Sequence, residues 1–215
     1  SRQFDMSILQ ATLQAEQALG ADLLVPLRKL SKKDATTRLK GIAELAELVR
    51  AGDEASGAPD AAALAELLAQ FVPLYVRLAA DTSRQVREQA SRLLGILAPR
   101  VGRQLAPHLR ALALPWLCAQ QDPAADVAAA ARAAFEAALP SASKRVDAVF
   151  FVRSELFAKA SGVIQSTAPP YLKGPNKDAE AEEAAERALS TALDALARAI
   201  ADVAHVAAAP HEDKA

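Results

Sequence analysis

The side chains best suited to metal or nucleophilic chemistry in this chain are His108, His205, His211 and Cys118. A structural zinc site takes about four nitrogen or sulfur ligands, usually in closely spaced pairs. These four residues are far apart in the sequence, and Cys118 has no C-x-x-C companion. The sequence therefore predicts no metal site in this segment and favours packed or surface helix positions for all four side chains.

Other catalytic patterns are also missing from the sequence. It contains no G-x-x-x-x-G-K-[ST], G-x-G-x-x-G or G-x-S-x-G motif, which would indicate phosphate binding, dinucleotide binding or an acyl-transfer nucleophile. The glutamates between residues 180 and 186 fall in the first turns of a predicted helix, where the macrodipole favours them. We therefore predict a non-catalytic segment with no cofactor and no small-molecule substrate, and an enzyme acting alone is the least favoured hypothesis.

Six basic residues gather in the stretch LRKLSKKDATTRLKGIAEL, residues 27–45. They are Arg28, Lys29, Lys32, Lys33, Arg38 and Lys40. One interpretation is a solvated helix junction, in which Ser31 and Asp34 cap helices and the lysines face water. The other is a docking edge for a large acidic partner.

The composition indicates an all-α protein around this cluster. Of the 215 residues, 52% are hydrophobic but only 4% are aromatic, and glycine numbers eight. Basic and acidic residues nearly balance at 25 and 26, so only a local patch could bind nucleic acid. One cysteine fits a reducing compartment, and we expect a cytoplasmic location. No apolar run of about 18 residues is apparent, so no membrane contact is expected.

Three similar segments indicate an internal repeat, and they align on Asp34, Asp81 and Asp122. Each aspartate precedes a helical pattern and is predicted to be its N-cap, and Pro123 would suit the first helical position. An aliphatic residue follows each aspartate at the fifth position, and alanine at the ninth, on one face of the predicted helix. These residues are Leu39, Val86 and Val127, and then Ala43, Ala90 and Ala131.

The repeat predicts a HEAT/armadillo-like α-solenoid of paired antiparallel helices, because two helices at this period are typical of those families. Each unit would consist of a helix A bent at a proline, a tight turn and a helix B. The prolines are Pro26, Pro73 and Pro115. We expect one domain over residues 1–209. Its parts are an opening helix at 4–19, a turn at 53–60, a helix pair or one bent helix at 143–165, a proline-rich loop with Tyr171 at 166–178, and a long helix at about 179–207, followed by a disordered tail at 210–215.

The basic stretch resembles the N-terminal signature of the listerin family, the RING-type ubiquitin ligases of ribosome-associated quality control. The matching residues are Leu30, Ser31, Lys32, Lys33, Asp34, Thr36, Thr37 and Lys40, with Arg38 where lysine is usual. The segment from Tyr75 to Glu88 is similar to the next listerin repeat, and the likeness covers most of residues 20–200. The chain is far shorter than a listerin and has no cysteine-rich RING.

The resemblance implies a HEAT-type domain that docks the ligase on an obstructed large ribosomal subunit carrying peptidyl-tRNA. A tRNA-sensing cofactor of the nuclear export mediator factor type would bind beside it, and zinc would be confined to the distant RING. The implied contact residues are Arg28, Lys29, Lys32, Lys33, Asp34, Thr36, Thr37, Arg38 and Lys40, with a possible second patch at Arg84 and Arg87. A generic HEAT scaffold for protein–protein interaction remains the alternative.

Overall fold

The computed structural model describes residues 19–51, 59–166 and 179–208, and their regular structure is entirely helical. A helix over residues 19–29 begins the described chain. The helices that follow are α2 (Ala35–Arg50), α3 (Ala61–Leu78), α4 (Arg84–Val101), α5 (Leu109–Ala119), α6 (Ala125–Ala138), α7 (Ala142–Phe151), α8 (Arg153–Ser166) and α9 (Ala179–Ala208), with a 3-10 helix η1 (Gly102–His108) between α4 and α5.

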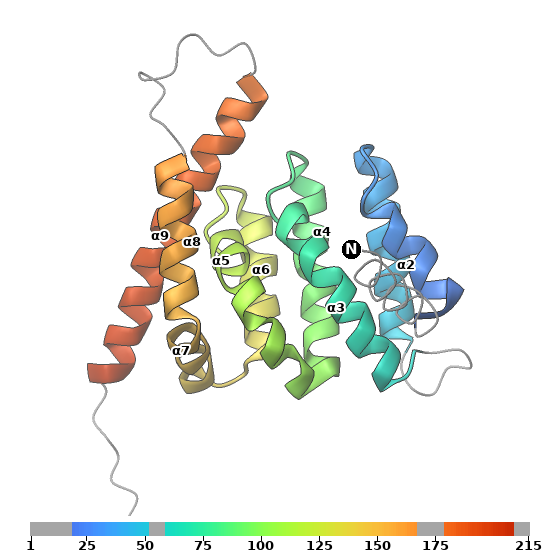
Figure 1. Cartoon of the computed structure of the whole chain (residues 1–215), viewed down its shortest axis with the longest axis horizontal. Helices are drawn as coiled ribbons and strands as arrows, with labels where there is room; N and C mark the ends of the chain where they lie inside the picture. Colours follow the sequence, from blue (N-terminus) through green and yellow to red (C-terminus); the bar gives the residue numbers. More distant parts are fainter. Residues whose placement is uncertain (1–18, 52–58, 167–178, 209–215) are drawn as a thin grey trace, which may run out of the picture.

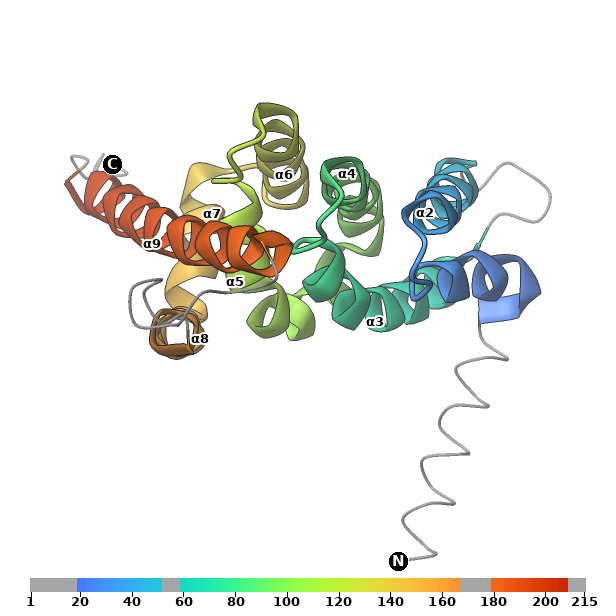
Figure 2. The same cartoon turned by 90° about the horizontal axis from the view of Figure 1, so that it is seen from above.

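The helices stand side by side in two rows, as a solenoid requires (Figure 1). Seen from above, α2, α4 and α6 form one row and α3, α5 and α8 lie in the other (Figure 2). Within the rows α4 contacts both α2 and α6, and α5 contacts α3 and α8. The prediction of an all-α solenoid of paired helices is confirmed.

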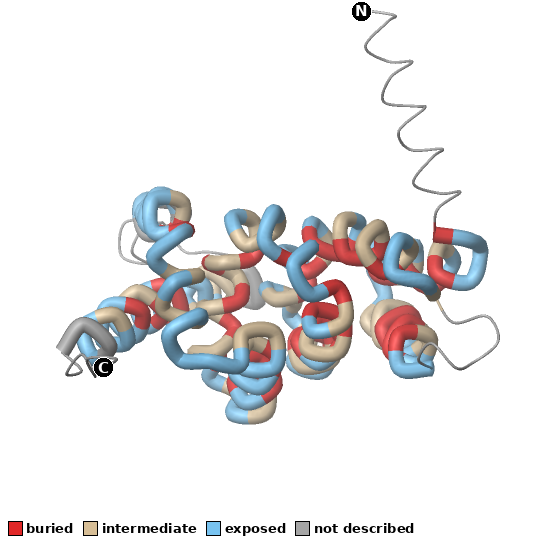
Figure 3. The backbone as a smooth tube through the Cα atoms, turned by 90° about the horizontal axis from the view of Figure 1, so that it is seen from below, coloured by how far each residue is buried: buried red, intermediate tan, exposed pale blue. Residues whose placement is uncertain are grey.

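The core lies between the two rows, where the buried positions gather (Figure 3). Phe71, Tyr75 and Trp116 are its largest buried side chains. Trp116 joins helix α5 to helix α6, because its Nε1 donates to the Ala131 carbonyl at 3.2 Å and its ring meets Phe135 edge-on at 5.1 Å. Aromatic pairs of this kind stabilise a fold beyond the burial of their apolar area. Trp116 therefore stabilises the packing of α5 against α6 in the third repeat.

Small residues let neighbouring helices approach closely. A Cβ added at Gly41 would lie 2.7 Å from the Pro26 carbonyl oxygen and from Lys29 Cβ, so α2 touches the backbone of the helix over residues 19–29. A Cβ at Gly95 would lie 3.0 Å from Ala134, where α4 meets α6. The alanine-rich composition therefore serves the same purpose as these glycines: it shortens the distance between helix axes.

The repeat register differs from the predicted alignment in the first unit. Val86, Ala90, Val127 and Ala131 are buried as expected, but Leu39 is half-buried and Ala43 is exposed. The buried small residue that corresponds to Ala90 is instead Gly41, two positions earlier in α2. Alignment on Asp34 was wrong because this aspartate caps its helix, whereas the aspartates of the next two units lie earlier, within the turn.

The prediction that all three aspartates are N-caps is correct only for Asp34, which caps α2. The N-caps of α4 and α6 are Ser83 and Ala124, so Pro123 precedes the helix instead of starting it. Asp81 and Asp122 each accept a hydrogen bond from the backbone amide two residues later, which closes the turn before the helix.

The C-terminal helices depart from the repeat. Residues 143–165 form the helix pair α7 and α8, and α9 stands where the long helix is predicted. Instead of pairing with one neighbour, α9 packs across α5, α7 and α8. The expected opening helix, most of the 53–60 turn, almost all of the proline-rich loop with Tyr171, and the tail lie outside the described residues.

One helix passes a membrane-span test, contrary to the expectation that no apolar run is long enough. Helix α3 has 18 residues of mean hydropathy 1.4, which by length and composition alone would allow it to cross a membrane. Seven of its residues are buried in the solenoid core, from Leu64 to Leu78, so its apolar character is accounted for by packing.

Candidate functional site

The basic stretch forms the turn between the first two helices of the described chain and the start of α2. Asp34 Oδ2 accepts hydrogen bonds from the Thr37 amide and the Thr37 hydroxyl, both at 2.7 Å. These two bonds, the hydroxyl first, hold the pKa of the Asp34 carboxyl below its usual value. Asp34 and Thr37 therefore shape the turn, and their side chains already bind each other.

The Arg38 side chain stabilises this turn through hydrogen bonds to its backbone. Its Nη1 donates to the carbonyls of Lys32 and Lys33, at 2.9 and 2.5 Å, and its Nη2 reaches Asp81 Oδ1 in the second repeat at 2.9 Å. The Arg38 and Asp81 side chains are only 12% and 11% exposed. Arg38 is thus a structural link between repeats, and its guanidinium is largely withdrawn from any partner.

Arg87 repeats this arrangement one unit further on. Its Nη1 donates to the carbonyls of Asp81 and Thr82, and its Nε and Nη2 bind the two carboxylate oxygens of Asp122 at 2.7 and 3.1 Å. This pair is more deeply buried, with side chains 6% and 4% exposed. We refer to the pairs Arg38–Asp81 and Arg87–Asp122 as the arginine ladder.

The expected second patch of Arg84 and Arg87 does not form at the surface. Arg87 is buried in the ladder, while Arg84 is exposed and bound through Nε and Nη2 to both oxygens of Asp126. The Asp126 carboxylate raises the pKa of Arg84, and Arg84 in turn lowers the pKa of Asp126. Arg84 alone remains at the surface, with its charge compensated.

Three lysines remain available on the basic stretch. Lys32 and Lys33 in the turn and Lys40 on α2 are exposed, with no side-chain partner within the described part of the chain. Ser31 and Thr36 are exposed beside them, and so is Arg28 on the preceding helix. Lys29 is half-buried and bound to Glu44 at 2.5 Å. The candidate docking edge is therefore narrower than predicted, and we define it as Lys32, Lys33 and Lys40.

The comparisons with known proteins bear on this edge. Residues 15–215 match the family model described as E3 ubiquitin-protein ligase listerin, N-terminal domain.

The chain belongs to the listerin family.

Curated relatives named E3 ubiquitin-protein ligase listerin support this assignment. The relative from Gallus gallus is 31% identical over 199 residues, which cover 90% of this chain and 11% of the relative. The relative from Mus musculus is also 31% identical, over 192 residues covering 88% of this chain and 10% of its own. The chain thus spans about a tenth of the length of these listerins. No solved structure matches this chain.

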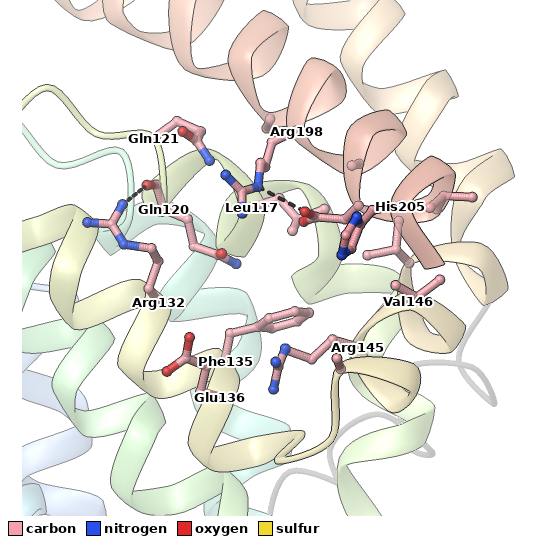
Figure 4. Close-up of a pocket in the computed structure, with 16 residues that line it drawn as sticks. Leu117, Gln120, Gln121, Arg132, Phe135, Glu136, Arg145, Val146, Arg198 and His205 are labelled. Carbon is pink, nitrogen blue, oxygen red and sulfur yellow. Dashed lines mark hydrogen bonds and ion pairs between the residues drawn. The ribbon is translucent and has the colours of Figure 1, made fainter. Parts of the chain in front are cut away.

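The listerin domain also contains a hollow of about 400 Å³ between α5, α6, α7 and α9 (Figure 4). Leu117 and Phe135 line it with apolar surface, and Arg145 and His205 lie at its wall. Arg145 donates to the Leu139 and Pro140 carbonyls, so it fastens the turn before α7 as Arg38 and Arg87 fasten theirs. The arginines of this hollow are therefore partly committed to structure.

Chemistry-bearing residues elsewhere are not brought together. Among the described residues, no three His, Cys, Asp or Glu side chains could jointly hold a metal ion. Cys118 is half-buried beside Thr191, and burial raises the pKa of its thiol to about 11. A thiol with that pKa is almost fully protonated at neutral pH and is a poor nucleophile.

The arginine ladder is the main feature that sequence analysis missed. The sequence favours surface positions for Arg38 and Arg87, because basic residues in a polar run usually face water. A usable signal is nevertheless present: each arginine follows a turn residue by six positions, as in Lys32 to Arg38 and Asp81 to Arg87. Alignment on this spacing gives the correct register for the first unit.

Proposed function

We propose that this listerin domain is a non-catalytic docking domain. It anchors the ligase on a large ribosomal subunit obstructed by peptidyl-tRNA, beside a tRNA-sensing cofactor of the nuclear export mediator factor type. From there a distant RING would ubiquitylate the stalled nascent chain in the cytoplasm. Membership of the listerin N-terminal family supports the proposal. The name of the relatives itself says only that they are E3 ubiquitin-protein ligases.

The observation that carries the proposal is the division of labour within the basic stretch. Asp34, Thr37 and Arg38 are bound to other groups and fix the shape of the turn. Lys32 and Lys33 contribute only backbone groups to this framework in the described structure, so their side chains are not needed to build it. A turn that is shaped by its own hydrogen bonds, and whose lysine side chains have no partners among the described residues, is suited to binding an anionic surface.

The chemistry of the edge favours phosphate. Each lysine that neutralises a nucleic-acid phosphate releases condensed counterions, which makes binding strongly dependent on salt. The exposed hydroxyls of Ser31 and Thr36 could donate further hydrogen bonds to phosphate oxygens without reading sequence. Such contacts would position the domain on ribosomal RNA and leave recognition of the stalled state to the cofactor.

A docking domain needs no catalytic centre of its own. The whole chain has one cysteine, which is too few for a cysteine-rich zinc-binding RING. Zinc and ubiquitin transfer are therefore assigned to another part of a full listerin. The alternative, a generic HEAT scaffold, shares the helical architecture but does not account for the listerin turn.

The test is co-sedimentation of the chain with large ribosomal subunits, with and without peptidyl-tRNA and the cofactor, across a salt series. The test variant carries Lys32→Glu, Lys33→Glu and Lys40→Glu. A matched control carries Arg77→Glu, Arg103→Glu and Lys144→Glu, which change the net charge equally at exposed positions elsewhere. We expect the test variant to bind about tenfold or more weakly and to show a shallower salt dependence, by about 0.7–0.9 in the log–log slope for each phosphate that is no longer neutralised.

Equal losses in both triple variants would show that only net charge matters and would remove the docking edge. Unchanged binding in the test variant would also remove the docking edge, because the charge of these lysines would then not contribute to binding. If the unaltered chain binds no subunit under any condition, the generic scaffold becomes the better description. Circular dichroism and melting temperature should be the same for all three proteins, because the substituted side chains have no partners in the described structure.

A further inference from the structure

Large apolar side chains are exposed mainly on the C-terminal helices. Five such residues there are each at least 49% exposed. They are Phe150, Phe151, Phe157, Leu193 and Ile200. Elsewhere in the described chain only Val25 and Val76 belong to the same class. Single exposed apolar residues are ordinary, but a group on adjoining helices marks a surface that is normally covered.

Three of these residues line one apolar groove of about 340 Å³ between α7, α8 and α9. Phe150 of α7, Phe157 of α8 and Ile200 of α9 contribute to its lining. The charged residue in the lining is Arg153, whose guanidinium lies over the Phe150 ring at 4.2 Å and donates to the Phe150 carbonyl. The groove thus offers apolar surface and almost no hydrogen-bonding groups, which suits aliphatic side chains.

Helix α9 extends this surface along its length. Leu193 and Ile200 are two turns apart on one face, and Leu196 and Val203 follow the same spacing beside them. The adjoining side of α9 is already used, because Ala199 packs in a cluster with Leu114 of α5 and with Leu156 and Ala160 of α8. The apolar surface of α9 therefore extends beyond the side that packs against α5 and α8.

Each earlier layer of this solenoid is covered by the next, since α4 contacts α2, α6 contacts α4, and α8 and α9 contact α5. Helices α8 and α9 form the end of the row opposite α2 (Figure 1). A terminal layer of a solenoid normally has a polar outer face that keeps the protein in solution. The face with Phe157 and Ile200 lacks this property, so it is built as an internal layer.

We propose that the groove between α7, α8 and α9 is the junction at which a following helical pair of the longer listerin chain stacks. The expected occupant presents a stripe of aliphatic residues at helical spacing toward Phe150, Phe157 and Ile200. The assignment of this chain to the N-terminal domain, together with relatives of which it covers about a tenth, supplies the polypeptide for such a layer. The junction lies at the other end of the row from the docking edge and does not depend on it.

The test measures thiol accessibility in a Cys118→Ala background, which leaves no other cysteine. Ile200→Cys and Phe157→Cys are each introduced into the 215-residue chain and into a chain that continues through the next segment of a listerin. Arg103→Cys, at an exposed site on η1, is the reference in both lengths. We expect labelling by a maleimide to slow about tenfold or more at positions 200 and 157 in the longer chain, with the reference rate unchanged.

Equal labelling rates in the two lengths would overturn the junction. Protection already present in the 215-residue chain and growing with protein concentration would instead assign the groove to contact between two copies, which also overturns the proposal. Cysteine at these exposed positions removes side-chain volume without adding charge, so folding should be retained, and helical circular dichroism checks this. The ribosome takes no part in the measurement, so its outcome is independent of the docking proposal.

Discussion

The first and second repeats carry an arginine at the same position of helix B, but the turns that precede these arginines differ in charge. In both, an arginine on helix B binds the two carbonyls of its own turn and then an aspartate of the following unit. In the second repeat the turn residue six positions before the arginine is Asp81, which accepts from Arg38. In the first repeat the same place is taken by Lys32, which can donate hydrogen bonds through its side chain but accept none.

This difference shows how a structural ladder can leave exposed cations at its end. A turn inside the ladder must supply a carboxylate to the preceding arginine, and its charge is neutralised there. The first turn supplies no carboxylate to an earlier arginine within the described chain. Its backbone carbonyls bind Arg38 as those of the second turn bind Arg87, but its side chains are Lys32 and Lys33. The listerin turn is therefore the same framework as its neighbours with the opposite charge at its surface.

The largest expected effect separates the two ladder pairs. Arg87→Ala should lower the free energy of unfolding by about 3–5 kcal/mol, because it leaves the buried Asp122 carboxylate without its partner. Arg38→Ala should cost less, about 1–3 kcal/mol, since its pair is more exposed and water can replace part of it. Denaturant unfolding of both variants measures the difference.

Double-mutant cycles with Asp122→Ala and Asp81→Ala then give the coupling energy of each pair. Equal costs at the two junctions would contradict the comparison, because burial would then have no influence. A coupling energy near zero for Arg87 and Asp122 would mean that the arginine acts only through the turn carbonyls.

A smaller effect is expected where the first repeat has glycine and the second and third have alanine. Gly41→Ala would bring a Cβ within 2.7 Å of the Pro26 carbonyl oxygen, and the strain should cost about 1–3 kcal/mol. Gly162→Ala is the matched control, since nothing lies within 4 Å of its added Cβ in α8. This control should gain about 0.5–1 kcal/mol from helix propensity.

Thermal unfolding of the two glycine variants should therefore move in opposite directions. A gain at position 41 would show that α2 and the preceding helix are free to separate, and that the close contact is not required. The reverse substitution at the corresponding position of the second repeat, Ala90→Gly, should also be mildly destabilising, because the Ala90 methyl group is buried in the core.

The smallest expected effect is a loss of folding stability at acidic pH. The pKa values of Asp34 and Asp126 are lowered in the folded protein, so each stabilises the fold fully above the ordinary carboxyl pKa of 3.8. That stabilisation should disappear as pH falls from about 3.8 through the lower folded pKa. Arg84→Gln removes the main cause at Asp126 and should flatten the acid limb of a pH–stability curve. An unchanged acid limb would mean that the exposed Arg84–Asp126 pair contributes nothing.

The sequence predicted the elements of this fold better than their register. Helix existence follows from local propensity and periodicity, and a capping pattern at Asp34 marks the start of α2, so the helix pairs and the cap at Asp34 were predictable. The ladder was not, because Arg87 and Asp122 are 35 residues apart and nothing local states that one seeks the other. Of the predicted contact residues, Arg38, Asp34 and Thr37 are bound within the turn, whereas the side chains of Lys32, Lys33 and Lys40 are exposed.

The ladder also has a direction, since each arginine belongs to the earlier unit and each aspartate to the later one. The second repeat carries both halves, accepting through Asp81 and donating through Arg87, whereas the first only donates and the third has Ala128 in place of the arginine. In a tandem duplication of the second repeat, every arginine of the ladder would therefore find an aspartate in the next unit. Duplication of either neighbour would leave one half unmatched, so growth of such a solenoid by gene duplication would proceed from its middle.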